Sequence, residues 1–189
     1  MPLVRPNERF TYADYLTWPE GERWELVDGE AFAMTPAPSF RHQRVTGRIY
    51  YLLEAALQQG PCVPCVSPVD VVLAQDTVVQ PDVVVVCDPS KIEPGGICGA
   101  PDLVVEVLSP STALRDRRTK RDLYERYGVR EYLTVDPVSR SAERYLLRDD
   151  GTYAMPDLFG PEDTVGLASL GGLEIPWNHV FEVISVEKG

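Results

Sequence analysis

Apolar residues recur along this chain with two different periods, and the changes between them predict an α/β fold. From Ser39 to Gln59 the apolar residues have helical spacing, and Gly60-Pro61 ends the predicted helix. Short runs of consecutive apolar residues predict buried strands at 69–73, 77–87, 102–108 and 131–135. We therefore expect one α/β domain that spans residues 1–189.

Shorter elements are predicted around this core. The turns at Asp28-Gly29 and Asp150-Gly151 predict an N-terminal hairpin over 24–34 and a C-terminal hairpin over 144–155. Residues 11–18 have the composition of a short capped helix. A further helix is expected after Ser109-Pro110-Ser111-Thr112, running to about Tyr127 and ending at Gly128.

An acid within an apolar run is the strongest chemical signal in this chain. Glu106 lies in Leu103-Val104-Val105-Glu106-Val107-Leu108, which is apolar on both faces. A carboxylate buried there is costly unless a cation or several hydrogen-bond donors compensate its charge. Asp82 begins a second run of this kind, Asp82-Val83-Val84-Val85-Val86. If the two strands are neighbours, both carboxylates converge on a site for Mg²⁺ or Mn²⁺, which prefer oxygen ligands.

Lys120 is the expected cation of this site. It is one of three lysines and falls in the helix after the Glu106 strand, with Tyr124 one turn later. That helix has to pack back across the sheet, which brings Lys120 within reach of Glu106. Asp102 has the same Pro-Asp context as Asp82, but it lies roughly 13 Å from Glu106 along one strand, too far to share an ion.

The net charge of −11 argues against a protein that coats nucleic acid by bulk electrostatics. Basic residues are nevertheless concentrated between Ser111 and Arg130, where seven of them stand against three acids. This local excess suits either contact with phosphates or the solvated face of a helix. We find no apolar run of membrane-spanning length and no signal-peptide pattern, so we expect a cytoplasmic protein with no membrane partner.

The cysteines and several isolated polar residues are expected to have structural roles. Cys62-Val63-Pro64-Cys65 has the spacing of a redox or zinc motif, but no second Cys or His pair follows at a suitable distance. Cys87 ends a valine run and is expected to pack in the core. Asp70 alternates with valines and is expected to face outward, whereas Trp177 and His179 are expected to pack in the tail.

Several short motifs occur in the same order as in a known protein family. They are the Glu25-Leu26-Val27-Asp28-Gly29-Glu30 hairpin, Arg41-His42-Gln43, Gln80-Pro81-Asp82, the segment from Glu106 to Thr112, Lys120 with Tyr124, Gly128-Val129-Arg130-Glu131-Tyr132, and Val135-Asp136-Pro137. Over about residues 20–145 the chain therefore resembles the Uma2 (DUF820) family, within the PD-(D/E)XK nuclease superfamily. The resemblance implies a restriction-endonuclease-like core, a mixed β-sheet flanked by helices. It also implies that Asp82 and Glu106 are metal ligands.

One position departs from the superfamily pattern. Leu108 stands where the acid-X-Lys motif has its lysine, and Lys120 fits the place of a lysine relocated to the following helix. Glu30 and His42 are accessory candidates for the site. Each also has a simpler interpretation, as an exposed strand residue and as a helix-capping or surface residue, respectively.

We expect a divalent-metal-dependent endonuclease that hydrolyses DNA, with Lys120 stabilising charge at the scissile phosphate. One alternative is a catalytically inactive nuclease-like fold that binds nucleic acid or protein, which the acidic charge and Leu108 favour. A weaker alternative is a hydrolase of nucleotides or other small phosphoesters. Apolar tail segments around Ile175 and Phe181 suggest a homodimer, in which two active sites would suit cleavage of both strands.

Overall fold

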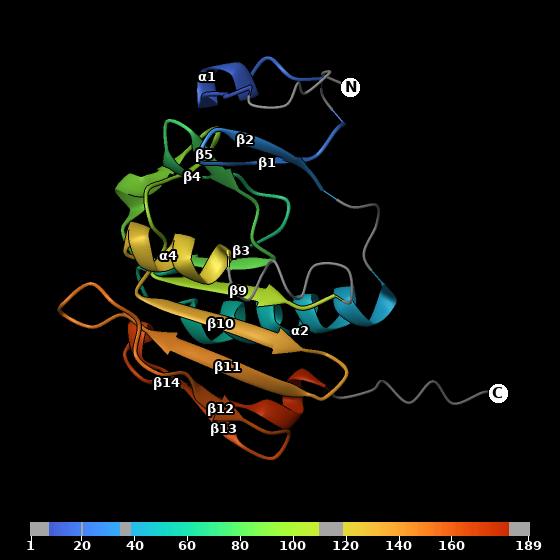
Figure 1. Ribbon diagram of the computed structural model, residues 1–189. Helices are drawn as coiled ribbons and strands as arrows, with labels where there is room; N and C mark the ends of the chain where they lie inside the picture. The colour runs from blue at the N-terminus through green and yellow to red at the C-terminus, as the bar shows by residue number, and fades with distance from the viewer. Residues whose placement is uncertain (1–7, 20, 35–38, 110–118, 182–189) are drawn as a thin grey trace.

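The computed structural model describes residues 8–19, 21–34, 39–109 and 119–181, and two six-stranded sheets dominate it (Figure 1). The N-terminal sheet has the order β2 (Glu30–Ala33), β1 (Trp24–Val27), β5 (Thr77–Val79), β4 (Val71–Ala74), β8 (Gly96–Cys98) and β7 (Ile92–Glu93). The central sheet has the order β12 (Asp157–Phe159), β11 (Ser141–Leu146), β10 (Glu131–Asp136), β9 (Leu103–Val107), β6 (Val83–Val86) and β3 (Val63–Val66). Each sheet mixes parallel and antiparallel pairs, since β9–β10 and β4–β8 are parallel.

Helices and short turns complete the described chain. The α-helices are α1 (Tyr12–Tyr15), α2 (Phe40–Leu57) and α4 (Arg121–Tyr127), and the 3₁₀ turns are η1 (Pro89–Lys91), η3 (Ala168–Leu170) and η4 (Trp177–Val180). A two-stranded hairpin, β13 (Thr164–Leu167) and β14 (Leu173–Pro176), follows the central sheet. The α/β architecture predicted from the periodicity is confirmed.

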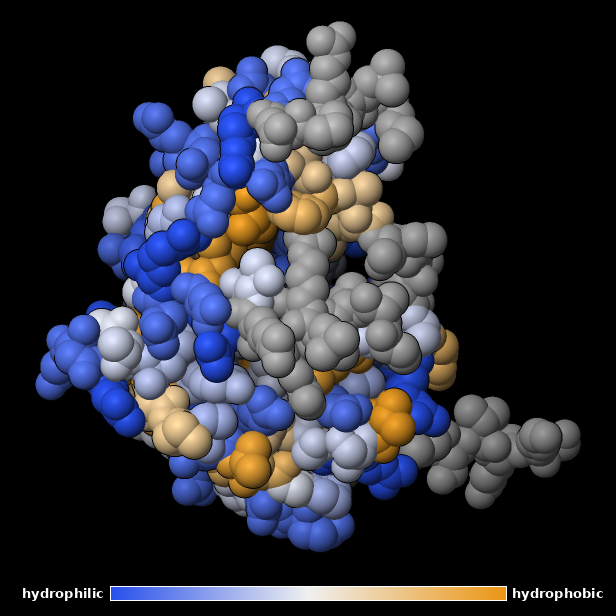
Figure 2. Space-filling view, viewed as in Figure 1, coloured by the Kyte–Doolittle hydropathy of each residue, from blue (hydrophilic) through white to orange (hydrophobic). Residues whose placement is uncertain are grey.

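The central sheet is buried on both faces. Val83 and Val105 face α2, the β13–β14 hairpin and η4, and they share one hydrophobic core with them. Their neighbours Val84 and Val104 point the other way, into a second core formed with α4 and the N-terminal sheet. Figure 2 shows apolar residues gathered in the hollow between the N-terminal sheet and α4. The prediction that β6 and β9 are apolar on both faces is therefore correct.

Helix α2 forms where the sequence places its signals. The Ser39 side chain accepts a hydrogen bond from the backbone N–H of His42 at 3.2 Å, which caps the first turn. The stripe of Val45, Ile49 and Leu53 is buried against the central sheet. The helix ends before Gly60, as predicted.

The predicted strand over 77–87 is two strands in two different sheets. β5 belongs to the N-terminal sheet and β6 to the central sheet, and Gln80-Pro81-Asp82 joins them. Pro81 has no backbone N–H to donate to a continuous strand ladder, which favours a break at this point. The break places Asp82 immediately before β6, at the edge where β9 ends.

Other differences concern elements whose partners are distant in sequence. Strands β3, β7 and β8 lie in segments where we expected no strand. The predicted hairpin over 144–155 is wrong in its pairing, because β11 pairs with β12 while residues 152–155 contribute one isolated bridge, Leu147 to Tyr153. α4 confirms the C-terminal part of the predicted helix, and its beginning at 111–118 lies outside the described residues.

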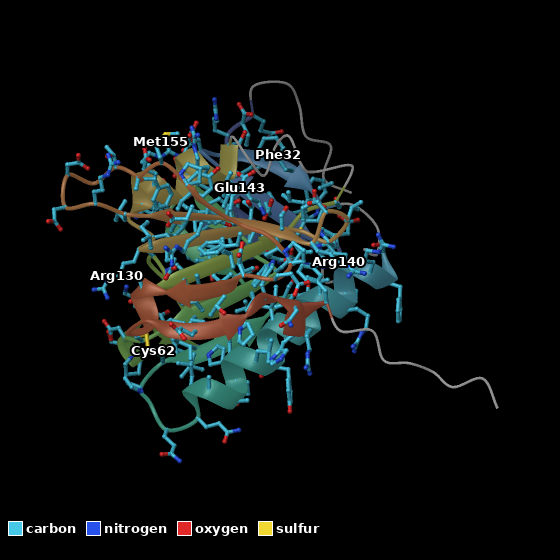
Figure 3. The ribbon with its side chains drawn as sticks, turned by 90° about the horizontal axis from the view of Figure 1, so that it is seen from below. Phe32, Cys62, Arg130, Arg140, Glu143 and Met155 are labelled. Carbon is cyan, nitrogen blue, oxygen red and sulfur yellow. A yellow bond between two sulfur atoms is a disulfide. The ribbon has the colours of Figure 1, made fainter. Side chains whose placement is uncertain are left out.

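The cysteines pair differently from the motif that their spacing suggests. Cys62 forms a disulfide with Cys87 at the end of the β3–β6 ladder, which agrees with the structural role that we expected rather than with a Cys62–Cys65 redox or zinc site (Figure 3). Cys87 is therefore more than a packing residue. Cys65 carries a free thiol and packs against the opposite core.

The apolar tail segments are part of the protein's own core. Ile175 and Trp177 are 5% and 1% exposed, and Trp177 stacks edge-on against Phe181 at a centroid distance of 5.7 Å. Ile175 therefore offers little surface for the dimer contact that we expected around Ile175 and Phe181, whereas Trp177 packs in the tail as predicted. Across the described ranges, we find no helix long and apolar enough to cross a membrane.

Candidate active site

Asp82 and Glu106 come from neighbouring strands of the central sheet. β6 and β9 run antiparallel with Val83 opposite Val105, so Asp82 stands beside the Glu106 end of β9. The Asp82 Oδ2 atom accepts a hydrogen bond of 2.8 Å from the Val107 backbone N–H. The strand adjacency on which the predicted pair of carboxylates depended is therefore present.

Lys120 reaches Glu106 from the start of α4. Its Nζ atom lies 2.7 Å from Glu106 Oε1 and 2.8 Å from Glu25 Oε1, and its side chain is only 7% exposed. One cation is thus shared by two buried carboxylates. Removing such charges from water costs free energy that only close pairing and additional hydrogen bonds offset.

Tyr124 supplies one of those hydrogen bonds. It follows Lys120 by one turn, and its hydroxyl donates to Glu106 Oε1 at 2.8 Å. Burial raises the pKa of Tyr124 well above its ordinary value, and the negative charges of Glu106 and Glu25 raise it further. The phenol therefore stays protonated at neutral pH and serves as a fixed donor to the carboxylate.

Glu25 is the site residue that our sequence analysis missed. It lies on β1 of the N-terminal sheet, is 4% exposed, and also accepts a hydrogen bond of 3.1 Å from the Gln80 backbone N–H. The signal was present in the sequence, since Trp24-Glu25-Leu26-Val27 is an acid in an apolar run, as at Glu106. The predicted accessory residue Glu30 is instead 56% exposed at its side chain and pairs with Arg9 at 3.2 Å.

His42 belongs to the site rather than to the surface. It lies in the first turn of α2 and is 8% exposed. Its Nε2 atom is 3.2 Å from Asp82 Oδ2, and its Nδ1 atom is 3.5 Å from Thr46 Oγ1. The His42 imidazole and the Val107 N–H both contact Asp82 Oδ2, and together they orient the carboxylate.

The other acids that we considered lie elsewhere. Asp102 is at the opposite end of β9, where it accepts from the Cys87 N–H at 2.7 Å and pairs with Arg130 at 3.1 Å. It is therefore outside the site, as expected. Asp70 was predicted to face outward, but it accepts from the Tyr15 hydroxyl at 2.9 Å and from the Gln80 side chain at 2.8 Å. Both Asp70 and Gln80 line a pocket of about 530 Å³.

The basic segment before Arg130 is largely paired with acids. Arg121 pairs with Asp122 at 2.6 Å, Arg126 with Asp28 at 2.6 Å, and Arg130 with Asp102 at 3.1 Å. The remaining arginines at 115, 117 and 118 lie outside the described residues. Within the described part, this segment therefore presents little unpaired positive charge.

The residues present fit a divalent ion whose remaining ligands come from water and substrate. Among the described residues, we find no group of three His, Cys, Asp or Glu that could enclose a metal. Two carboxylates are nevertheless the usual protein share for Mg²⁺, which keeps waters and takes oxygens from a substrate phosphate. Thr134, paired with Glu106 in the β9–β10 register, has a buried hydroxyl without a hydrogen-bond partner in the described structure. Such an atom beside the carboxylates suits a site that water or ligand oxygens complete.

Two strand-borne carboxylates and a lysine, at the edge of a mixed sheet flanked by helices, define a restriction-endonuclease-like protein. A crystal structure of a putative nuclease of DUF820 from Anabaena variabilis has the same fold, with a TM-score of 0.75, 19% sequence identity, and coverage of 91% of this chain and 97% of the other. The family model Uma2, described as "Putative restriction endonuclease", matches residues 12–178. The chain belongs to the Uma2 family.

A second relative supports the same assignment. A protein of Synechocystis sp., described as uncharacterized, is 32% identical over 170 residues, which are 88% of this chain and 88% of that protein. The resemblance found in the sequence motifs is therefore confirmed at the level of the family and the fold.

Proposed function

We propose that this protein is a divalent-metal-dependent endonuclease that hydrolyses phosphodiester bonds in DNA. The observation that carries the proposal is the juxtaposition of Asp82 and Glu106 on adjacent strands, with the Lys120 amine 2.7 Å from Glu106. Membership of a family described as putative restriction endonucleases supports the same reaction.

The carboxylates of Asp82 and Glu106 would hold Mg²⁺ or Mn²⁺. When bound, such an ion polarises the phosphodiester and lowers the pKa of an attacking water. The protein's own contribution is to orient these ligands: His42 and the Val107 N–H position Asp82, and Tyr124 donates to Glu106. Lys120 would stabilise negative charge at the scissile phosphate, where a preorganised cation in a buried site is most effective.

The pairing of Lys120 favours one alternative function. Its amine contacts two carboxylates, and buried Leu108 occupies the place of the acid-X-Lys lysine. These features suit a nuclease-like fold that binds nucleic acid or protein without cleaving it. That alternative requires metal-independent binding that is unchanged in an Asp82→Ala variant, whereas the endonuclease requires Asp82 for metal-dependent turnover.

The state of association and the location in the cell are part of the proposal. We infer that the protein acts in the cytoplasm and forms a homodimer. The dimer is inferred because two copies of the site would suit cleavage of both DNA strands. Ile175 lies within the core, so we infer that most of the contact face lies on other surfaces. Sedimentation should give twice the mass of the chain, and a monomer at micromolar concentration would exclude the dimer.

The decisive experiment compares two acids of the same strand. Glu106→Gln should lower the rate of Mg²⁺-dependent DNA cleavage by at least ~10³-fold, because a metal ligand and its charge are lost. Asp102→Asn is the matched control, since Asp102 lies on the same sheet edge as Arg130 and outside the site. It should cleave at the wild-type rate.

Anomalous scattering from a crystal soaked in Mn²⁺ tests the same assignment without a substrate. A peak between Asp82 and Glu106 is expected. Cleavage that survives intact in Glu106→Gln, or a soaked crystal with no peak at these carboxylates, would overturn the endonuclease assignment.

A further inference from the structure

The first half of helix α2 presents arginines beside the candidate active site. Three arginines and no acid occur between Phe40 and Leu53, in a chain whose net charge is −11. Arg41 and Arg44 are exposed and one turn apart, so they share one face of the helix. Neither forms a hydrogen bond or ion pair with another residue of the described ranges, in contrast to the paired arginines of α4.

Arg48 and two aromatic residues continue this face. Arg48 is fixed by donating to the His179 carbonyl oxygen at 2.9 Å, and its guanidinium lies 5.3 Å from the centroid of the Tyr51 ring. Phe40 and Tyr51 are 83% and 58% exposed. We call Phe40, Arg41, Arg44, Arg48 and Tyr51 the α2 face. Basic side chains interleaved with exposed aromatic rings are typical of surfaces that bind nucleic acid.

The α2 face adjoins the candidate active site through His42. This residue lies between Arg41 and Arg44 in sequence, yet it points inward and contacts Asp82 at 3.2 Å. The same turn of the helix therefore has one side in the site and the other in solvent. A nucleic-acid backbone that passes the Asp82 carboxylate would meet Arg41 and Arg44 within one turn of α2.

A further arginine lies at the same end of the molecule. β9 and β10 are parallel, so both end at the edge of the sheet where Asp82 lies and where α2 begins. Arg140 is exposed in the turn that follows β10. Figures 1 and 3 both show this turn at the end of the central sheet where α2 starts, with Arg140 labelled in Figure 3. The arginines of α2 and Arg140 therefore lie on two sides of the candidate active site.

We propose that the α2 face, with Arg140, is where the DNA backbone docks, Arg41 and Arg44 each contacting a phosphate that flanks the scissile one. This inference rests on the proposed function, because it takes DNA as the substrate. It assigns the contact to α2 rather than to the basic segment before Arg130, whose described arginines are occupied by acids. In an acidic protein, such a confined cationic strip also restricts the orientation in which DNA can approach.

The salt dependence of DNA binding tests the proposal. Affinity of a labelled duplex is measured by fluorescence anisotropy over a range of salt concentrations, with Ca²⁺ replacing Mg²⁺ and gels confirming that the DNA stays intact. Each of Arg41→Gln and Arg44→Gln should reduce the magnitude of the slope of log K against log salt by about 0.9, the value for one phosphate contact. The double variant should reduce it by about twice that amount and bind ~10-fold or more weakly.

Arg148→Gln is the matched control, because it makes the same change in net charge at the other end of the sheet. Arg148 is exposed in the turn after β11, whose Leu146 pairs with Glu131 at the beginning of β10. Its slope should equal that of the wild type. Equal slopes in all five proteins, or no binding of duplex DNA, would overturn the docking assignment. Cleavage by Glu106→Gln reports separately on the proposed function, so the two failures are distinguishable.

Discussion

Lys120 illustrates how one buried cation can stabilise the fold and be available to the chemistry of the site. Its amine lies within 2.8 Å of carboxylates from both sheets, and its side chain is 7% exposed. A lysine so enclosed loses its hydration, and close contact with these carboxylates compensates for that loss. Glu25 and Glu106 would repel one another without it, because both are almost fully buried.

Replacing this cation should destabilise the protein strongly. Lys120→Met leaves two buried carboxylates without their partner, so the free energy of unfolding measured by urea denaturation should fall by about 3–5 kcal/mol. Adding Glu25→Gln should recover part of the loss, because one of the uncompensated charges is removed. Lys91→Met is the control, since the Lys91 amine donates to the Ala100 carbonyl oxygen rather than to a buried acid. A loss of less than about 1 kcal/mol in Lys120→Met would contradict the buried-cation interpretation.

The sequence predicts the burial of a residue well when the residues next to it in the chain are apolar. Glu106 and Asp82 stand in or beside runs long enough to be recognised as central strands, and Lys120 follows from the helix after them. Glu25 stands in a shorter apolar run, and the groups that contact it, the Lys120 amine and the Gln80 N–H, come from segments distant in sequence. The adjacent turn drew attention to Glu30, which lies on the exposed second strand of the same hairpin.

At the scale of elements, two glycines have different roles in helices: one ends a helix, and the other lies inside one. Gly128 has φ = 80° at the C-terminal cap of α4, a left-handed conformation that a Cβ atom disfavours. Gly47 lies in the interior of α2 with ordinary helical geometry, and a Cβ there would meet no atom within 4 Å. The same substitution should therefore have opposite effects at the two positions.

Alanine at each glycine tests this contrast. Gly128→Ala should lower the free energy of unfolding by about 1 kcal/mol, because alanine resists the left-handed conformation. Gly47→Ala should raise it by about 0.5–1 kcal/mol, because alanine loses less backbone entropy within a helix. Thermal and urea unfolding of the two variants would measure both. Shifts of the same sign would contradict this account.

Elements with strong local signals were predicted well, and those defined by distant partners were not. The pattern of α2 includes its cap, its apolar stripe and its stop, so its bounds follow closely from the sequence. The break at Gln80-Pro81-Asp82 is visible only as one proline, because the valines on either side look like a single strand. Strands β3, β7 and β8 are short, and their pairing partners supply most of their stabilisation.

At the scale of the whole molecule, buried phenols connect stability to pH. The pKa values of Tyr15, Tyr124 and Tyr153 are all raised, in each case mainly because burial disfavours the phenolate. The folded protein therefore holds these protons more tightly than the unfolded chain does. Their contribution to stability is complete below the ordinary phenol pKa of about 10 and is lost as the pH rises from there toward the folded-state values.

The free energy of unfolding should accordingly fall above about pH 10, by up to ~1.4 kcal/mol per pH unit for each buried tyrosine. Urea denaturation at a series of alkaline pH values would measure the slope. Tyr153→Phe, which removes a phenol that donates to the Val129 carbonyl oxygen, should make the slope shallower. Tyr51→Phe is the control, because it removes a phenol that is 58% exposed rather than buried. Equal slopes in all three proteins would contradict the burial argument.

Because Lys120 bridges Glu25 on the N-terminal sheet and Glu106 on the central sheet, the site cannot exist in either sheet alone. The order in which the chain assembles then becomes a safeguard against premature chemistry. A nascent chain that has completed the N-terminal hairpin still lacks the lysine, which is synthesised much later, and contacts between residues so far apart in sequence close late in folding. The proposed cleavage activity would therefore appear only when the two sheets dock, and a partly folded molecule would be harmless to the DNA around it.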